Sequence, residues 1–495
     1  MLFNSIEFLL FSLIVLPTYF LLPTRSRWIL LLIASIFFYG FWKVEYLGLI
    51  FVSAITDFFC ARKMAESHTK QARKPYLWLS LIVNLGLLAV FKYSNFFLDS
   101  VNQISGGHAG FNGLDLILPM GISFYTFQTL AYTIDVYRGQ IVPEKNFGIF
   151  SLYVTFFPQL VAGPIERASA LMPQLKAGHR FSIERVVYGF RLVIWGLFKK
   201  VVIADRLATF VDPIYAESGA YNGMILLTAT FFFAIQIYCD FSGYSDMAIG
   251  LARILGVDLM RNFRTPYFSV SIGDFWSRWH ISLSTWFRDY VYIPLGGNRV
   301  SRFRWNLNIF IVFLVSGLWH GANWTYVIWG ALHGIYLFLE NCLRPLFSRF
   351  SAVTILRPAR TVICFGLVLI GWVFFRASDV NSAIFILNDI SSISLAELKD
   401  MGWIFKQFGS IELSNFQEPV NVQGLRLPFN LGQFAIAVFL SIFIITVEQF
   451  YEMNVLGVKA FSIKVIPYTI CVSVLLVTVV LLGYFDSNEF IYFQF

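Results

Sequence analysis

Long runs of apolar residues, separated by short polar or basic loops, repeat along almost the whole chain. A membrane-spanning helix needs about 20 consecutive apolar residues. The predicted spans are 5–22, 28–42, 45–61, 76–98, 188–206, 222–238, 306–342 (two helices, broken near Gly321), 360–376, 430–450 and 464–485. Residues 115–165 and 255–300 mix apolar runs with proline, glycine and charges, which is typical of re-entrant or interfacial helices around a buried cavity.

The composition supports a membrane protein. Of the 495 residues, 57% are hydrophobic and only 13% are charged, whereas a soluble domain is usually about 25% charged. The net charge of +8 comes from basic residues scattered through short loops, which is a poor pattern for nucleic-acid binding. We therefore expect an all-α polytopic membrane protein, with residues 1–485 forming one transmembrane domain.

The basic loops predict an orientation, because cytoplasmic loops carry an excess of lysine and arginine. Arg25 and Arg27 follow the first predicted span, so the N-terminus should lie outside. The segments 165–200 and 253–304 are rich in basic residues and should be cytoplasmic. The linker 377–429 carries more acid than base and should lie outside, where it could hold a short helix or two.

Common catalytic and metal-binding motifs do not occur in the sequence. The five cysteines show no C-x-x-C spacing, so neither a zinc site nor a disulfide framework is predicted. We also find no G-x-S-x-G, Walker or H-E-x-x-H pattern. The chemistry must therefore be sought among polar residues that lie inside apolar segments, which are functional candidates by default.

The sharpest such segment is "GLWHGANWTYVIWGALHG", Gly317–Gly334. His320 follows an apolar helix and stands between Trp319 and Gly321, where glycine allows close approach of a ligand or another backbone. A buried imidazole in a helix bundle needs a partner, so we interpret His320 as a functional candidate rather than a packed core residue, with Trp319 and Asn323 as candidates for lining a cavity. For His333, on the next helix, structural packing is the better interpretation.

A second segment, "FWSRWHISLSTWFRDYVYIPLGGNR", Phe275–Arg299, mixes aromatic, apolar and basic residues like an interfacial helix. Two interpretations remain open. It could be an amphipathic anchor whose arginines reach the lipid headgroups. Alternatively, His280 faces inward, and Arg278, Arg288 and Arg299 bind the phosphates of a nucleotide-bearing donor at the cytoplasmic mouth.

Two weaker segments add candidates for cavity lining. "CDFSGYSDMAIG" contains Asp240, Ser242 and Tyr244, and could line a cavity or form a hydrogen-bonded helix junction. "PMGISFYTFQTLAYTIDVYRG" places Gln128 among aromatic residues.

These motifs resemble those of the membrane-bound O-acyltransferase (MBOAT) family, in particular its bacterial branch that acetylates exported polysaccharides. The resemblance runs from "SIFFYGFWK" to "GWVFFRA" and is most specific in the two histidine segments. It implies a ring of tilted helices around a thin centre, reached by a cytoplasmic and an outer funnel. It further implies that His320 is the catalytic histidine and His280 the second polar residue of the site.

The resemblance also implies a function. An acetyl group would pass from a cytosolic thioester, acetyl-CoA, across a bacterial inner membrane to an alginate-, cellulose- or peptidoglycan-type polysaccharide. Acetyl-CoA would be a substrate, with no bound cofactor or metal. The implied partners are membrane lipid, the exported polysaccharide and an extracytoplasmic SGNH-hydrolase-like acetyltransferase. The alternative is a polysaccharide or lipid transporter or flippase subunit, which often has inverted repeats, and we find none.

The last ten residues, 486–495, contain the aromatic segment "NEFIYFQF", and Lys459 and Lys464 place the loop before the final span inside. The tail should therefore reach the outer face. In a D-alanylating relative, a separate peptide ends in a similar aromatic tail with a tyrosine. That likeness implies that Tyr492 accepts the acyl group, although an aromatic tail could also simply pack at the interface.

Overall fold

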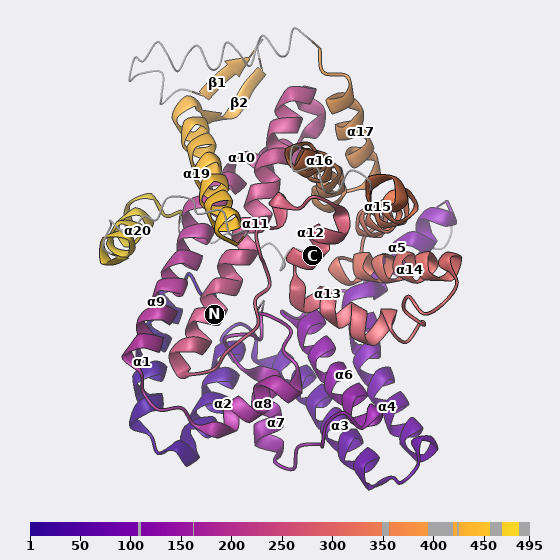
Figure 1. Ribbon diagram of the computed structural model, residues 1–495, viewed down its shortest axis with the longest axis vertical. Helices are drawn as coiled ribbons and strands as arrows, with labels where there is room; N and C mark the ends of the chain where they lie inside the picture. Colours follow the sequence, from indigo (N-terminus) through magenta and orange to yellow (C-terminus); the bar gives the residue numbers. More distant parts are fainter. Residues whose placement is uncertain are drawn as a thin grey trace. The chain divides into compact units, whose positions relative to one another are not determined.

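The computed structural model (Figure 1) describes residues 1–106, 110–161, 163–348, 356–394, 419–422, 425–455 and 468–484. The chain forms two compact units. The first contains Met1–Leu197, Tyr244–Asn262 and Arg288–Tyr290. The second contains Phe198–Gly243, Phe263–Phe287 and Val291–Phe495.

All the regular secondary structure in the described part of the first unit is helical. Its helices are α1 (Ile6–Leu21), α2 (Thr24–Gly40), η1 (Val44–Tyr46), α3 (Leu47–Glu66), α4 (Lys70–Leu88), η2 (Ala89–Tyr93), α5 (Ser94–Ile104), α6 (Ile122–Arg138), α7 (Phe147–Thr155), α8 (Ala168–Ala177) and α9 (Ile183–Leu197). Helix α6 is buried along almost its whole length. The mixed composition of 115–165 therefore reflects, in part, an unbroken helix that contacts protein on most sides.

Helices α3, α4 and α6 pack against one another (Figure 1) around a buried polar network. The Asn84 amide donates to both carboxylate oxygens of Asp57, at 3.0 and 2.9 Å, and the Ser80 hydroxyl donates to the same carboxylate. Ser53 donates to the Asn84 carbonyl oxygen at 2.5 Å. Polar groups that lack water need such partners, and here they join neighbouring helices.

The second unit contains the remaining helices and a small hairpin. Its elements are η3 (Phe198–Ala204), α10 (Asp205–Ala216), η4 (Ser218–Ala220), α11 (Gly223–Leu255), η5 (Pro266–Phe268), α12 (Ile272–Arg278), α13 (Ile281–Phe287), η6 (Arg288–Tyr292), α14 (Arg302–His320), α15 (Trp324–Ser348), α16 (Arg357–Arg376), α17 (Val380–Ser391), β1 (Pro419–Val422), β2 (Leu425–Asn430), α19 (Leu431–Val455) and α20 (Tyr468–Leu482). The C-terminal end of α11 and the start of η6 belong to the first unit.

Helices α14 and α15 form a tight antiparallel pair. An added Cβ on Gly317 would lie 2.3 Å from the Tyr326 carbonyl oxygen, and one on Gly330 would lie 2.3 Å from the Phe313 carbonyl oxygen. The two glycines therefore let the backbones touch, as small residues do between membrane helices. Asn323 immediately precedes α15, and its side-chain oxygen accepts the Thr325 N–H at 3.0 Å, which caps the helix.

The predicted fold class, an all-α polytopic membrane protein, is confirmed. Five of the described helices are long and apolar enough to cross a membrane: Val44–Glu66, Lys70–Ile104, Gly223–Leu255, Arg357–Arg376 and Gly432–Met453. The predicted break near Gly321 is also confirmed, because α14 ends at His320 and Gly321 is extended.

One detail of the prediction is wrong. The span 222–238 was too short, because α11 continues to Leu255; Asp240 remains inside the helix since Lys200 neutralises it. The linker 377–429 contains the expected short helix, α17, and the antiparallel hairpin of β1 and β2 begins within it. The predicted tail, residues 486–495, lies outside the described residues.

Candidate active site

His320 is the last residue of α14 and is buried, with 2% of its surface exposed. Its Nδ1 lies 2.7 Å from the carbonyl oxygen of Ser316, one turn earlier. A carbonyl oxygen can only accept a hydrogen bond, so Nδ1 must carry the proton in this contact. In the neutral ring, Nε2 is then the nitrogen with the lone pair, and it is the atom that can take up a proton.

His280 connects α12 to α13 and is completely buried. Its φ of +43° is uncommon for a residue other than glycine, so the surrounding structure holds the backbone in a strained conformation. The ring centroids of His280 and His320 are 6.4 Å apart. Trp319 packs against both rings, at 5.9 and 5.0 Å. The structure therefore brings three predicted site residues together, and the catalytic roles of the two histidines stay predictions.

Aromatic side chains from other helices surround this histidine pair. Phe241 of α11 contacts His280 at 4.6 Å, and Trp329 of α15 contacts His320 at 4.7 Å between ring centroids. His333 lies one turn beyond Trp329 and accepts a hydrogen bond from the Trp276 indole at 3.2 Å. The structure thus gives His333 a packing contact, as the sequence indicated.

Asp240 and Ser242 flank Phe241 on α11, and both contact lysines of η3. The Lys200 ammonium lies 2.7 Å from Asp240 and 2.8 Å from Asp205. Lys199 donates to the Ser242 hydroxyl at 2.9 Å. These contacts support the helix-junction interpretation of this segment. The two lysines and Asp205 were not singled out from the sequence, although "FKKVVIADR" places two positive charges inside an apolar run.

The other predicted cavity-lining residues have structural contacts. Asn323 donates to the Ser378 carbonyl oxygen at 3.0 Å, in addition to capping α15. Gln128 and Tyr244 belong to the first unit. There, Gln128 donates to the Tyr153 carbonyl oxygen at 2.6 Å, and Tyr244 stacks on Phe3 at 4.4 Å. That these three residues line a cavity stays a prediction.

Arg278 is held in a partly buried ion cluster. Its guanidinium lies 2.8 Å from Asp274 and 2.8 Å from Glu452 of α19. Glu452 also pairs with Arg357 at 2.9 Å and accepts a hydrogen bond from Thr265 at 2.6 Å. Glu452 and Arg357 were not singled out from the sequence, because 174 and 79 residues respectively separate them from Arg278 (452 − 278 and 357 − 278).

The two other candidate donor-binding arginines lie in different surroundings. Arg288 belongs to the first unit, is largely exposed and pairs with Asp289 at 2.8 Å. Arg299 belongs to the second unit and is exposed. Donor binding by either residue stays a prediction, as does the role of Tyr492, which lies outside the described residues.

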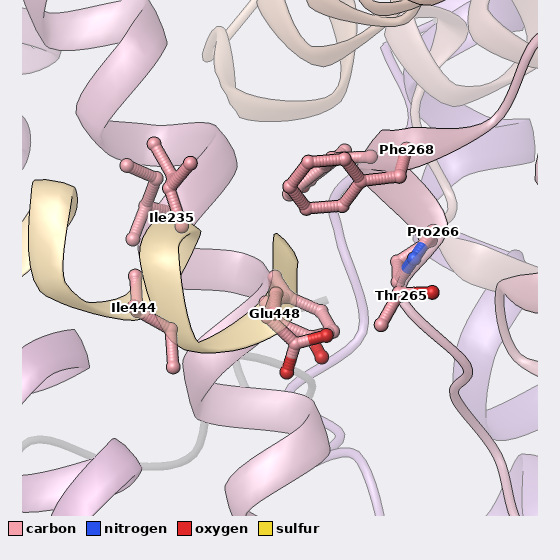
Figure 2. Close-up of a pocket in the computed structure, with 9 residues that line it drawn as sticks. Ile235, Thr265, Pro266, Phe268, Ile444 and Glu448 are labelled. Atoms are coloured by element: carbon pink, nitrogen blue, oxygen red, sulfur yellow. The ribbon is translucent and has the colours of Figure 1, made fainter. Parts of the chain in front are cut away.

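A small pocket lies beside the ion cluster of Arg278 and Glu452 (Figure 2). Ile235 of α11 and Ile444 of α19 form one side, and the turn from Thr265 to Phe268 forms the other. Its lining residues are Ile235, Tyr238, Thr265, Pro266, Tyr267, Phe268, Ile444, Ile445 and Glu448.

The residues that line the pocket contact both the Arg278–Glu452 ion cluster and Trp279, next to His280. Thr265 contacts both Arg278, at 3.3 Å, and Glu452. The rings of two other lining residues, Tyr238 and Tyr267, lie 6.4 and 6.1 Å from Trp279, the neighbour of His280. The lining of the pocket therefore contacts both the arginine-bearing ion cluster and an aromatic residue next to the histidine site.

Comparison with known proteins identifies the family. Residues 145–378, which include both histidines, match the model of the membrane-bound O-acyltransferase family. The probable alginate O-acetylase AlgI of Azotobacter vinelandii is 44% identical over 388 residues, which cover 77% of this chain and 76% of that protein. The chain belongs to the MBOAT family.

Two other relatives show the range of MBOAT chemistry. The peptidoglycan O-acetyltransferase of Helicobacter pylori is 38% identical over 397 residues, covering 74% of this chain and 75% of that protein. The teichoic acid D-alanyltransferase of Streptococcus thermophilus is 29% identical over 244 residues, covering 46% and 59%. The predicted membership and the predicted enzyme class, an acyltransferase, are confirmed.

Proposed function

We propose that this MBOAT protein transfers an acetyl group from a cytosolic thioester, acetyl-CoA, for O-acetylation of an exported polysaccharide. The observation that carries the proposal is the buried pair of His280 and His320, with the Nδ1 proton of His320 directed to the Ser316 carbonyl oxygen. The names of the alginate and peptidoglycan O-acetylating relatives support an acetyl donor and a polysaccharide acceptor.

In the proposed reaction, His320 acts as a general base and then as a general acid. The acceptor hydroxyl oxygen attacks the thioester carbonyl carbon, its proton passes to His320 Nε2, and the π electrons of the carbonyl move to its oxygen. When those electrons return, the carbon–sulfur bond breaks. The thiolate takes the proton from His320, which leaves an ester and free CoA.

The donor would approach through the pocket of the second unit. Arg278 and Arg357 lie beside it, and guanidinium groups bind phosphate well. The basic loops support a cytoplasmic position for this entrance and an outer position for both termini. A bacterial inner membrane is the location that fits a cytosolic donor and an exported acceptor.

The test uses purified protein with acetyl-CoA labelled in the acetyl group. An acyltransferase releases free CoA in proportion to the label that it transfers, and this release requires His320. Transport of intact acetyl-CoA into vesicles without release of CoA would overturn the proposal in favour of the transporter alternative.

We further propose that Tyr492 carries the acetyl group between the site and a separate extracytoplasmic acetyltransferase of the SGNH-hydrolase type. The support is one phenolic hydroxyl in an aromatic tail that the charge pattern predicts to lie outside. A free tyrosine has a pKa of about 10 and needs a base, which His320 would supply. The resulting aryl ester is a good donor, because phenoxide leaves more readily than an alkoxide.

Tyr492→Phe keeps the aromatic ring and removes only the oxygen that would be acylated. We expect this variant to bind acetyl-CoA normally but to leave the polysaccharide without acetyl groups in cells. Tyr484→Phe removes another tyrosine hydroxyl near the end of α20 and should acetylate normally. Full acetylation by Tyr492→Phe would favour direct transfer to the partner.

A further inference from the structure

Three buried tryptophans of the second unit have indole N–H groups without a hydrogen-bond acceptor among the described residues. They are Trp279, Trp329 and Trp372, and at most 1% of each is exposed. Two other indoles of this unit are paired: Trp276 donates to His333 at 3.2 Å, and Trp305 donates to Tyr292 at 2.8 Å. Because a buried donor without an acceptor costs free energy, three of them together need an explanation.

The three rings form a continuous row that ends at the candidate catalytic histidine. Trp329 contacts His320 at 4.7 Å, Trp372 lies 6.3 Å from Trp329, and Trp279 lies 5.0 Å from Trp372. At its other end, Trp279 meets Tyr238 and Tyr267 of the pocket. The row of rings therefore extends from the lining of the pocket to His320.

Gly371 of α16 lies at the N–H edge of Trp329, the indole that contacts His320. A Cβ added there would lie 3.5 Å from the Trp329 indole nitrogen, an ordinary contact, and 3.0 Å from His333 Nε2, a tight one. A larger residue at this position would therefore crowd His333 first and would also cover the N–H edge of Trp329. A glycine at such a point allows close approach of another group.

We propose that these three indole N–H groups bind the carbonyl oxygens of an acyl-pantetheine arm. Such an arm has three carbonyl groups in a row, one in the thioester and two in amides, so that its acceptors match the row of donors in number and order. Trp329, beside His320, would bind the thioester oxygen. Trp372 and Trp279 would bind the two amide oxygens. This inference rests on the thioester donor of the proposed function.

The roles of the three donors differ during the reaction. When the acceptor hydroxyl attacks, negative charge develops on the thioester oxygen, and a donor already aimed at it stabilises the transition state more than the ground state. Each indole keeps its proton throughout, and His320 alone exchanges one. Trp329 should therefore affect kcat, whereas Trp372 and Trp279 should affect the binding of the donor.

The experiment replaces each tryptophan with phenylalanine and measures kcat and KM for CoA release from acetyl-CoA. Removing one such donor from a transition-state site lowers kcat by about 100- to 1000-fold, which is the result expected for Trp329→Phe. Trp372→Phe and Trp279→Phe should raise KM by roughly 3- to 10-fold, as for the loss of one hydrogen bond. Trp305→Phe, which removes a paired indole, is the matched control and should change neither constant.

Two donor analogues test the thioester contact directly by competition binding. Acetonyl-CoA keeps the carbonyl oxygen but cannot react, and S-ethyl-CoA lacks that oxygen. Wild-type protein should bind acetonyl-CoA more tightly than S-ethyl-CoA by roughly 3- to 10-fold, and Trp329→Phe should lose the preference. Equal binding of both analogues by the wild type, or an unchanged kcat in Trp329→Phe, would overturn the inference.

If the phenylalanine variant fails to fold, benzothienylalanine at position 329 replaces only the indole N–H with sulfur and keeps the ring shape. An acetylated acyl carrier protein has the same arm as acetyl-CoA, so both donors are assayed. With whichever donor the enzyme turns over, we expect a lower kcat for the Trp329 variant and a higher KM for the Trp372 and Trp279 variants. A wild-type protein that turns over neither donor and binds neither analogue would refute the proposed function itself. Turnover with no effect of the three variants would refute only the inference.

Discussion

Two buried polar clusters of the second unit differ in how their hydrogen-bonding groups are used. In the cluster of Lys200, Asp205 and Asp240, one ammonium lies within 2.8 Å of both carboxylates. In the row of Trp279, Trp329 and Trp372, the indole donors have no acceptor among the described residues. Both clusters are buried, so burial alone does not distinguish a structural cluster from a site.

The difference indicates which cluster is built for a ligand. A polar cluster whose members pair with one another contributes to holding helices together, and loss of one member leaves the rest uncompensated. Buried donors without an acceptor destabilise the protein when no ligand is bound. A ligand that supplies fitting acceptors removes this destabilisation. Mutations in the Lys200–Asp205–Asp240 cluster should therefore lower the stability of the protein, and mutations in the tryptophan row should lower its activity.

The largest expected effect is that of His320→Ala on activity. Loss of the general base should lower kcat by about 100- to 10,000-fold, while the melting temperature stays close to that of the wild type. The measurement is CoA release by purified protein, together with thermal melting. His68→Ala removes an exposed histidine and should retain full activity.

Retention of more than a tenth of the activity by His320→Ala would contradict its role as the base. A large fall in melting temperature would instead place His320 with the structural clusters, and the contrast between the two clusters would no longer hold.

The next largest effect is on stability and concerns the cluster of Lys200, Asp205 and Asp240. Lys200→Met leaves two buried carboxylates without their shared cation, which should cost about 3–5 kcal/mol of unfolding free energy. Replacing Asp205 and Asp240 with asparagine in the same variant should restore most of this loss. Thermal or denaturant unfolding in detergent measures both.

Lys63→Met is the matched control for Lys200→Met, because its ion pair with Glu66 is solvent-exposed. Exposed pairs contribute about 0–1 kcal/mol. Similar losses in the two variants would show that the buried cluster has no special structural role.

The smallest effect concerns Glu452, which forms ion pairs with both Arg278 and Arg357. Glu452→Gln should reduce stability by about 1.5–3 kcal/mol, the usual contribution of hydrogen bonds to charged groups. It should also increase the rise in melting temperature that CoA produces, because the freed guanidinium groups can bind phosphate. Melting curves with and without CoA measure both changes.

Arg278→Gln provides the complementary variant for Glu452→Gln and should reduce the stabilisation by CoA. If neither variant changes the response to CoA, the donor phosphates bind elsewhere, and Arg288 and Arg299 become the next residues to test.

The break after His320 illustrates how much the sequence revealed about the fold. An apolar run ending in "WHGAN" predicted that the helix stops near Gly321, and α14 ends at His320. The end of α11 could not be predicted in this way. Asp240 looked like the end of an apolar helix, but Lys200, 40 residues earlier in the chain (240 − 200), neutralises it and the helix continues.

The candidate site was predictable to a similar degree. Local motifs and family resemblance pointed to His280, Trp319 and His320, which the fold places together. The same reasoning selected Arg278 as a free phosphate ligand, whereas Glu452 of a distant helix already binds it. Long-range ion pairs leave no periodic or local signal in the chain, so they escape sequence analysis.

The sequence by itself determined that this is a membrane protein, and it determined most of the helices and the histidine motifs. Hydrophobicity, helix breakers and short motifs are local properties of the chain. Only the tertiary structure decided which buried polar groups pair and which do not, because each partner comes from a distant helix. Trp279, Trp329 and Trp372 look alike in the sequence as aromatic residues among apolar neighbours. Their row of unused N–H donors exists only once α15, α16 and the end of α12 have packed together.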